Sequence, residues 1–166
     1  YTNPHGTYVG EWVDGKIHGF GLWKGQSSDG SAFEFEGQFE SGEPTEGVGT
    51  DSEGTYVGEY KDWYRHGVGT MKYLSGVVYE GRWYVSARRG YGKLSYPGGS
   101  VFEGRLDDDS GNQISGEGTL YEPDGDQQIG SFSYCELLFG WYHSKTGRSC
   151  EVQYGSPVKR GCYTND

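Results

Sequence analysis

The fold is decided by the stretch Tyr8-Val9-Gly10-Glu11-Trp12-Val13-Asp14-Gly15-Lys16-Ile17-His18-Gly19-Phe20-Gly21. Two aromatic residues flank a glycine at a spacing of two, a turn pair follows, and a Gly-x-Gly closes the stretch. Side chains two positions apart lie on one face of a β-strand, so Tyr8, Gly10 and Trp12 are predicted to share a face. The Asp14-Gly15 pair is typical of a tight hairpin turn. The stretch therefore predicts a β-hairpin.

The same pattern recurs along the chain. Further copies begin at Phe35, Tyr56, Tyr79 and Phe102, and a degraded sixth keeps only Gly130 and Phe132 in register. The departures from the pattern are Trp63 and Ser86 at the turn glycine, Leu106 for an aromatic residue, and a turn lengthened through Asp107–Gly111. No segment shows a helical period with caps. The repeats predict an all-β fold, an elongated single-layer antiparallel sheet of consecutive hairpins.

Composition agrees with an aromatic core. The 166 residues include 31 glycines and are 16% aromatic, whereas aliphatic residues are few. A large ring can lie across a neighbouring strand only where that strand presents hydrogen in place of a side chain. We therefore expect the Gly-x-Gly of each returning strand to make room for the Tyr and Trp rings, which would stack from repeat to repeat.

Two domains are predicted from where the pattern stops. Residues 1–133 would form the repeat array and residues 134–166 a C-terminal cap of further strands. The cap is read as strands at Leu137–His143 and Arg148–Tyr154, joined by a turn at Ser144–Gly147. An array needs such an atypical end to cover its last open edge.

These copies resemble the MORN repeat (membrane occupation and recognition nexus). The stretch at Tyr8 carries the resemblance most clearly, the copies at Tyr56 and Tyr79 follow it nearly as closely, and it covers about residues 6–132. The resemblance implies an elongated antiparallel sheet used as an interaction module. Family members include scaffolds, junction proteins and the N-terminal part of a SET-type lysine methyltransferase, and both phospholipid and protein binding are associated with them.

The aromatic strip is the first candidate for a binding surface. A single layer leaves ring surface uncovered, and exposed contiguous apolar surface usually marks a partner site. The alternative is that the rings only pack the core. The favoured hypothesis is a non-enzymatic scaffold that binds a protein segment through the aromatic and Gly-lined face. The candidate residues are Tyr8, Trp12, Phe35, Phe39, Tyr56, Tyr60, Tyr79, Trp83 and Phe102.

Charge gives the rival hypothesis. The net charge of −10 argues against nucleic acid as a partner. Residues 61–100 are nevertheless basic and could engage phospholipid headgroups or an acidic peptide. The alternatives are solvated charges, or a role of the whole chain as the accessory module of a SET-type methyltransferase. The candidate anion-binding residues are Arg65, Lys72, Arg82, Arg88, Arg89 and Lys93.

Catalytic and metal chemistry have little support in the sequence. No Gly-x-Ser-x-Gly, phosphate loop or calcium-loop spacing is present, and the repeated His18 and His66 point to a structural role. A Cys3His zinc site at Cys135, His143, Cys150 and Cys162 is disfavoured because no Cys-x-x-Cys occurs. We predict no enzyme activity, no cofactor and no metal. The chain is expected to be cytoplasmic, and association with the cytoskeleton or with a membrane is left open. Homodimerisation is left open as well.

Overall fold

The computed structural model describes residues 2–3, 6–26, 30–106, 113–153 and 160–164, with only the backbone for 2–3 and 160–164. All elements in the described chain are β-strands, which confirms the all-β prediction. Their bounds are β1 Thr2–Asn3, β2 Gly6–Val13, β3 Lys16–Gln26, β4 Ala32–Glu40, β5 Glu43–Thr50, β6 Gly54–Lys61, β7 Tyr64–Tyr73, β8 Val78–Tyr84, β9 Ala87–Ser95, β10 Val101–Leu106, β11 Gly116–Tyr121, β12 Gln127–Ser133, β13 Glu136–His143, β14 Arg148–Val152 and β15 Arg160–Thr164.

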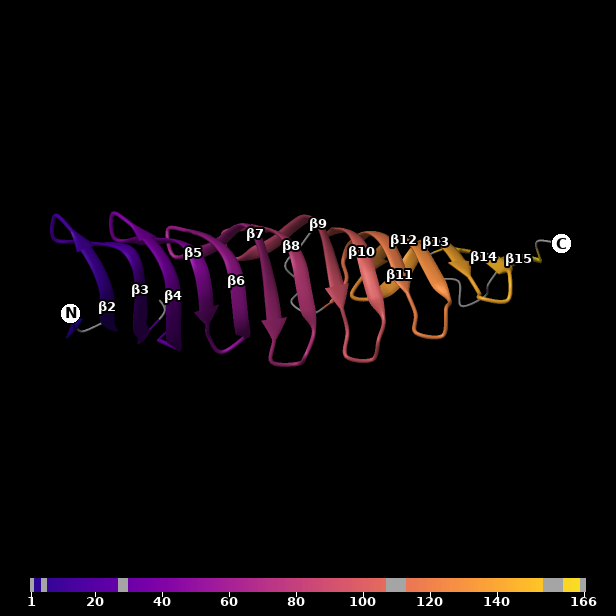
Figure 1. The fold of residues 1–166 in the computed structure, drawn as a ribbon. Coiled ribbons are helices and arrows are strands. Elements are labelled where there is room, and N and C mark those ends of the chain that lie inside the picture. The colour runs from indigo at the N-terminus through magenta and orange to yellow at the C-terminus, as the bar shows by residue number, and fades with distance from the viewer. Residues whose placement is uncertain (1, 4–5, 27–29, 107–112, 154–159, 165–166) are drawn as a thin grey trace. The chain divides into compact units, whose positions relative to one another are not determined.

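The chain forms two compact units. Unit 1 comprises Tyr1–Ser75 with Arg82–Ala87, and unit 2 comprises Gly76–Gly81 with Arg88–Asp166. Within unit 1, β1 to β7 pair antiparallel in chain order. Within unit 2, β9 to β15 do the same. Each unit is thus an open antiparallel sheet of consecutive hairpins, as predicted (Figure 1).

The hairpins turn through two residues in the left-handed region. Asp14 and Gly15 have φ of 49° and 74°, and Val13 pairs with Lys16 across them. The two copies that lack the turn glycine keep the same turn. Asp62-Trp63 has φ of 52° and 67°, and Val85-Ser86 has φ of 50° and 59°. The turn is therefore imposed by the strand register and not by glycine alone. The predicted insertion at Asp107–Gly111 lies outside the described residues.

The glycines make room for the rings, as the sequence predicts. A Cβ built on Gly21 would lie 2.2 Å from the hydroxyl oxygen of Tyr8, and one on Gly69 would lie 2.2 Å from that of Tyr56. Gly10 pairs with Gly21 and Gly58 with Gly69, so two facing glycines let each tyrosine ring lie across both strands. Any side chain at these positions would displace the ring.

The rings bridge one hairpin to the next by edge-to-face contacts. In unit 1 the centroid of Tyr8 lies 5.2 Å from that of Phe39, and Phe35 lies 4.9 Å from Tyr60. Tyr56 continues the series with Trp83 at 5.2 Å. This geometry suits the ring quadrupoles and adds to the area buried. Neighbouring repeats therefore share one aromatic core in unit 1.

The last part of unit 2 continues the sheet. β13 and β14 occupy the predicted strand positions, and the turn at Ser144–Gly147 closes with Gly147 donating to the Ser144 carbonyl. Cys135 is free and exposed, whereas Cys150 is buried and disulfide-bonded. Because a disulfide sulfur offers no thiolate, Cys150 drops out of the Cys3His set. The boundary at residues 133 and 134 stays a prediction.

Candidate partner-binding surface

The predicted aromatic strip is the core of the protein. Trp12 is the one predicted member with substantial exposure, at 43%. The expectation that a single layer leaves ring surface uncovered is therefore wrong for the other eight, because facing glycines let each ring lie flat on the sheet and the next hairpin covers it. Binding through the strip stays a prediction, with Trp12 as its accessible member. The buried members are Tyr8, Phe35, Phe39, Tyr56, Tyr60, Tyr79, Trp83 and Phe102.

The tyrosine hydroxyls bind backbone carbonyls next to the turns, including those of the repeated histidines. The Tyr56 hydroxyl donates to the backbone carbonyls of Glu59 at 3.1 Å and His66 at 3.0 Å. The Tyr8 hydroxyl donates to the Glu11 carbonyl at 3.2 Å. In each copy the hydroxyl thus satisfies backbone groups at the point where the strand register shifts. His66 contributes only its backbone carbonyl there, so the structural role of the histidine side chains stays a prediction.

Arg65, the first predicted anion-binding residue, is buried and already paired. It forms ion pairs with Asp51 and with Glu53, the latter at 2.8 Å. Its guanidinium also lies 5.5 Å from the ring centroid of Trp83 and 5.9 Å from that of Tyr56. Burial alone lowers the pKa of Arg65, but the carboxylates of Asp51 and Glu53 outweigh it and raise the pKa. Arg65 is therefore a packed core cation.

Arg88 occupies the equivalent position in the next copy, in unit 2. Its side chain is 1% exposed, lies 5.5 Å from the ring centroid of Tyr79 and donates to the Gln113 carbonyl at 3.1 Å. Lys93, half-buried, lies 3.8 Å from the Glu103 carboxylate. Among the six predicted basic residues, those that are exposed are Lys72, Arg82 and Arg89. Arg65 and Arg88 are therefore core residues, and anion binding by the exposed members stays a prediction.

The accessible surface of unit 1 is the opposite face of its sheet, here called the outer face. It consists of the side chains of β2 to β7 that alternate with the buried rings. One row of directly paired residues crosses all six strands, and we call it the central row. Its members in strand order are Val9, Leu22, Glu36, Val48, Val57 and Thr70.

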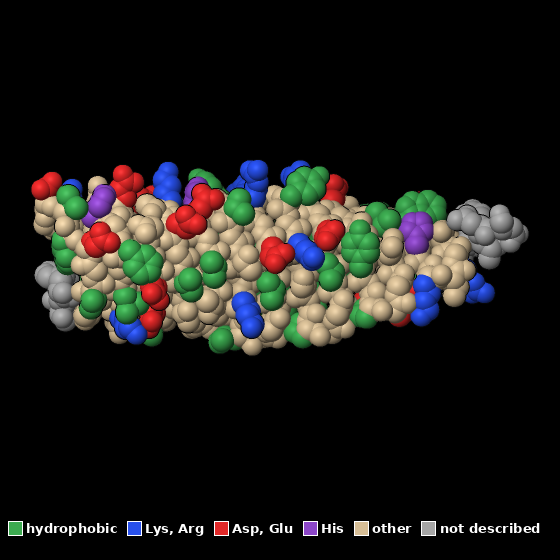
Figure 2. All heavy atoms as spheres, viewed as in Figure 1, with side chains coloured by type: hydrophobic (Ala, Val, Ile, Leu, Met, Phe, Trp, Pro, Cys, Tyr) green, Lys and Arg blue, Asp and Glu red, His purple; other side chains and the backbone are tan. Residues whose placement is uncertain are grey.

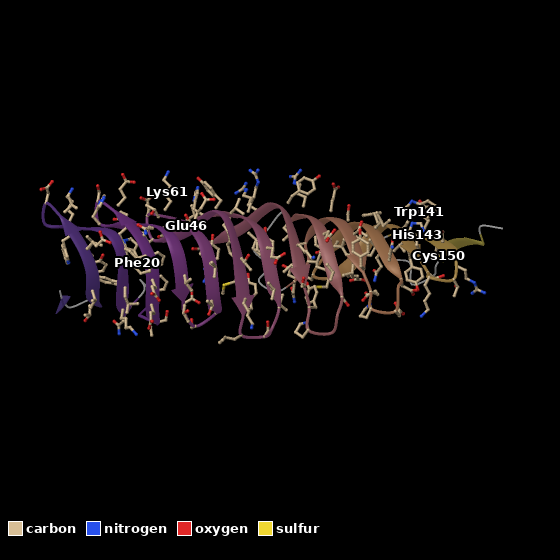
Figure 3. All side chains as sticks on the ribbon, in the orientation of Figure 1. Phe20, Glu46, Lys61, Trp141, His143 and Cys150 are labelled. Atoms are coloured by element: carbon tan, nitrogen blue, oxygen red, sulfur yellow. The ribbon has the colours of Figure 1, made fainter. Side chains whose placement is uncertain are left out.

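The central row exposes aliphatic side chains. Val9 is 66% exposed, Val57 50% and Val48 41%. Phe20 lies beside the row and is 50% exposed, and Figure 3 shows its ring on the side of the sheet that faces the viewer. Figure 2 shows hydrophobic and acidic side chains side by side on this face of unit 1. These residues, which we call the stripe, are mostly apolar and open to solvent, and Glu36 interrupts the central row between Leu22 and Val48.

A second row, the acidic row, runs beside the stripe: Phe20, Gln38, Glu46, Glu59 and His66. Glu46 and Glu59 are directly opposite each other on β5 and β6, and both are exposed. Glu59 also accepts a hydrogen bond from the Val68 amide at 2.9 Å. On the other side of the stripe Lys24 and Glu34 form an ion pair at 2.8 Å. The outer face is thus largely apolar along its centre, with Glu36 as the charged member of the central row, and acidic along one side.

One feature of the sequence, the residue between the two glycines of each Gly-x-Gly, predicts this exposed face and was not used in the sequence analysis. The middle residue of Gly-x-Gly is apolar in the first four copies: Phe20, Val48, Val68 and Tyr91. All four are exposed, because the flanking glycines face the rings and the middle residue must point the other way. An apolar residue recurring on the solvent side of four repeats is unusual for a half-buried sheet, where polar residues are the norm.

A family model for the MORN repeat matches residues 8–30, 56–78 and 79–101. The chain is a MORN-repeat protein. The three matches fall on the first, third and fourth copies found in the sequence, and MORN repeats form a scaffold family that is generally non-catalytic. No curated protein matches the chain. In the described part of the chain, no group of three or more His, Cys, Asp or Glu side chains is placed to hold a metal, and no helix is long and apolar enough to cross a membrane.

Proposed function

We propose that this MORN-repeat chain is a non-enzymatic scaffold that binds a protein partner through the outer face of unit 1. The observation that carries the proposal is the central row, in which Val9, Val48 and Val57 expose aliphatic side chains on a regular sheet. Val48 and Val57 are directly paired, and exposed apolar surface with a polar surround is typical of a protein-binding site. The rings on the other face are already covered by their neighbours, so they stabilise the fold.

The energetics favour a partner that covers the row. Each square ångström of apolar surface removed from water contributes about 25 cal/mol, so burying several valine side chains contributes a few kcal/mol to association. The strands beneath are fixed by continuous ladders and by the aromatic core, so little backbone needs to be ordered on binding. The outer face is therefore a preformed platform.

The phospholipid alternative has less support. Of the basic residues considered for it, Arg65 and Arg88 are buried and Lys93 lies near a carboxylate. A headgroup site needs several cations converging on one place. Protein binding is the better-supported function.

The proposal is tested by comparing proteins captured from a source extract. Two baits are compared, the wild-type chain and a Val48→Thr/Val57→Thr variant. Threonine keeps the shape and strand preference of valine but removes apolar surface. Val101→Thr/Ile129→Thr in unit 2 is the matched control. We expect the same partner to be recovered by wild type and control and to be lost by the Val48/Val57 variant. Equal recovery by all three, with each variant folded by circular dichroism, would exclude the outer face of unit 1.

A fourth bait tests the aromatic strip separately. Trp12→Ala removes the accessible ring without changing the outer face. Loss of the partner with Trp12→Ala but not with Val48→Thr/Val57→Thr would place binding on the aromatic side, as the sequence first suggested.

A further inference from the structure

We infer that the partner segment held on the outer face of unit 1 is a basic polypeptide that carries apolar side chains among lysines or arginines. The inference rests on the proposed function and adds the chemistry of the occupant. It is carried by the charge of the acidic row and by its position beside the central row.

The acidic row places like charges against each other. Glu46 and Glu59 are a directly opposed cross-strand pair, and Glu36 in the central row is diagonal to Glu46. Opposed like charges destabilise a sheet, by an amount comparable to the gain from an opposite pair. None of the cross-strand partners within this row is Lys or Arg. The fold compensates these charges only in part, because Glu59 accepts a hydrogen bond from the Val68 amide and Lys61 lies two residues further along β6 on the same face. A cation from outside the chain would neutralise Glu46 and Glu59 further.

The row on the other side of the stripe is nearly neutral in charge, and this difference between the two sides predicts how a bound segment is oriented. There the row reads Thr7, Lys24, Glu34, Thr50, Thr55 and Lys72, with Lys24 and Glu34 already paired. A bound segment should thus place its cations toward Glu36, Glu46 and Glu59. Its apolar side chains would lie on the valines of the central row.

Charge also argues against the competing occupants. A second copy of the chain would bring a second net charge of −10 to an acidic face, which disfavours self-association through it. Anionic lipid and nucleic acid would be repelled by this face for the same reason. A basic protein segment is the occupant that the face complements.

The span of the central row determines how long a test peptide must be. Six strands spaced about 4.8 Å apart give the central row a span of about 24 Å, which an extended peptide of about seven or eight residues covers. In a strand, residues two apart share a face, so a Val-Val-Lys-Lys repeat presents both Val and Lys on each face. Two such repeats make an eight-residue probe.

The experiment measures peptide affinity by fluorescence anisotropy with three labelled peptides. The probe is Val-Val-Lys-Lys in two repeats. The comparison peptides replace Lys by Glu in one case and Val by Ser in the other. We expect the probe to bind at least about tenfold more tightly than either comparison peptide at about 50 mM salt, and to weaken several-fold at about 300 mM salt because exposed charge pairs are screened.

Matched variants locate the effect. Glu36→Gln/Glu46→Gln should weaken the Lys-containing probe about tenfold, whereas Glu117→Gln/Glu136→Gln in unit 2, with the same change in net charge, should leave its affinity unchanged. Equal affinity for the Lys and Glu peptides, or no loss in the Glu36/Glu46 variant, overturns the inference. So does the absence of binding by the probe.

The same assay separates this failure from failure of the proposed function. If Val48→Thr/Val57→Thr abolishes binding while Glu36→Gln/Glu46→Gln does not, the surface is right and the basic character of the partner is wrong. If neither variant alters peptide binding, and capture from extract is unaffected as well, the outer face is not the binding surface.

Discussion

The guanidinium of Arg65 lies 5.5 Å from the ring centroid of Trp83 and is held there by the carboxylates of Asp51 and Glu53. Arg65 is the second residue of the returning strand β7, and Trp83 is the second-last residue of the outgoing strand β8. The two acids belong to the connector before β6. One side chain thus links three segments of unit 1. Backbone bonds reinforce the link, since the Ser86 amide donates to the Arg65 carbonyl at 3.0 Å.

Replacing Arg65 should therefore destabilise the protein. Arg65→Met keeps much of the volume but leaves Asp51 without its partner in a half-buried place, and we expect a loss of about 2–4 kcal/mol in the free energy of unfolding. Urea denaturation followed by tryptophan fluorescence measures it. Lys72→Met, at an exposed position, is the control and should change stability by less than about 0.5 kcal/mol. Equal effects of the two substitutions would contradict the structural role of Arg65.

The paired glycines give a second prediction. A Cβ on Gly69 would lie 2.2 Å from the hydroxyl oxygen of Tyr56 and 2.3 Å from its Cζ atom, in the middle of the aromatic core. Gly69→Ala should lower the free energy of unfolding by at least about 1–3 kcal/mol, because the ring must leave its site. Gly98→Ala is the matched control, since nothing lies within 4 Å of a Cβ there and its φ is not in the left-handed region. A neutral Gly69→Ala would show that the ring can move without cost.

The turn at Val85-Ser86 yields a stabilising substitution. Val85 is a β-branched residue held at φ 50°, a conformation that asparagine adopts far more readily. Val85→Asn should raise the free energy of unfolding by about 1 kcal/mol, as measured by thermal and chemical denaturation. Asp62→Asn, at the equivalent turn position, should have little effect because aspartate already tolerates the left-handed region. If Val85→Asn destabilises the protein, the exposed valine side chain contributes packing that outweighs its strain.

Much of the fold could be predicted from the sequence because the repeat itself contains the local rules. A spacing of two, a turn pair and a glycine pair define each hairpin, and five successive copies determine how the hairpins follow one another. The strands at Glu136–His143 and Arg148–Val152 were also found within one or two residues of their bounds. The hairpins and strand bounds depend on residues close together in the chain, and these can be read directly from one sequence.

Burial of individual side chains was harder to predict, because it depends on which residues of other strands are brought next to them by strand pairing. The sequence places Arg65 and Arg88 in a basic segment, but the core position they share is set by the hairpin register and by Tyr56 and Tyr79 beneath them. The central row was missed for the same reason. Val9, Leu22, Val48 and Val57 are far apart in the sequence and become one surface only through the pairing of β2 to β6.

Tyr60 provides the last prediction, which concerns alkaline pH. Burial raises the pKa of the Tyr60 hydroxyl well above its ordinary value near 10, and the charge of Arg65 opposes that shift only in part. The folded protein therefore holds this proton more tightly than the unfolded chain does. The resulting stability is present in full below about pH 10 and is lost as the pH rises from there toward the pKa of the folded state.

We expect the free energy of unfolding of the wild type to fall between pH 9.5 and about 11.5. Tyr60→Phe, which has no proton to lose, should reduce that fall, whereas Tyr91→Phe at an exposed position should not. Urea titrations at a series of pH values measure the slopes, and identical slopes for wild type and Tyr60→Phe would show that Tyr60 does not govern alkaline unfolding.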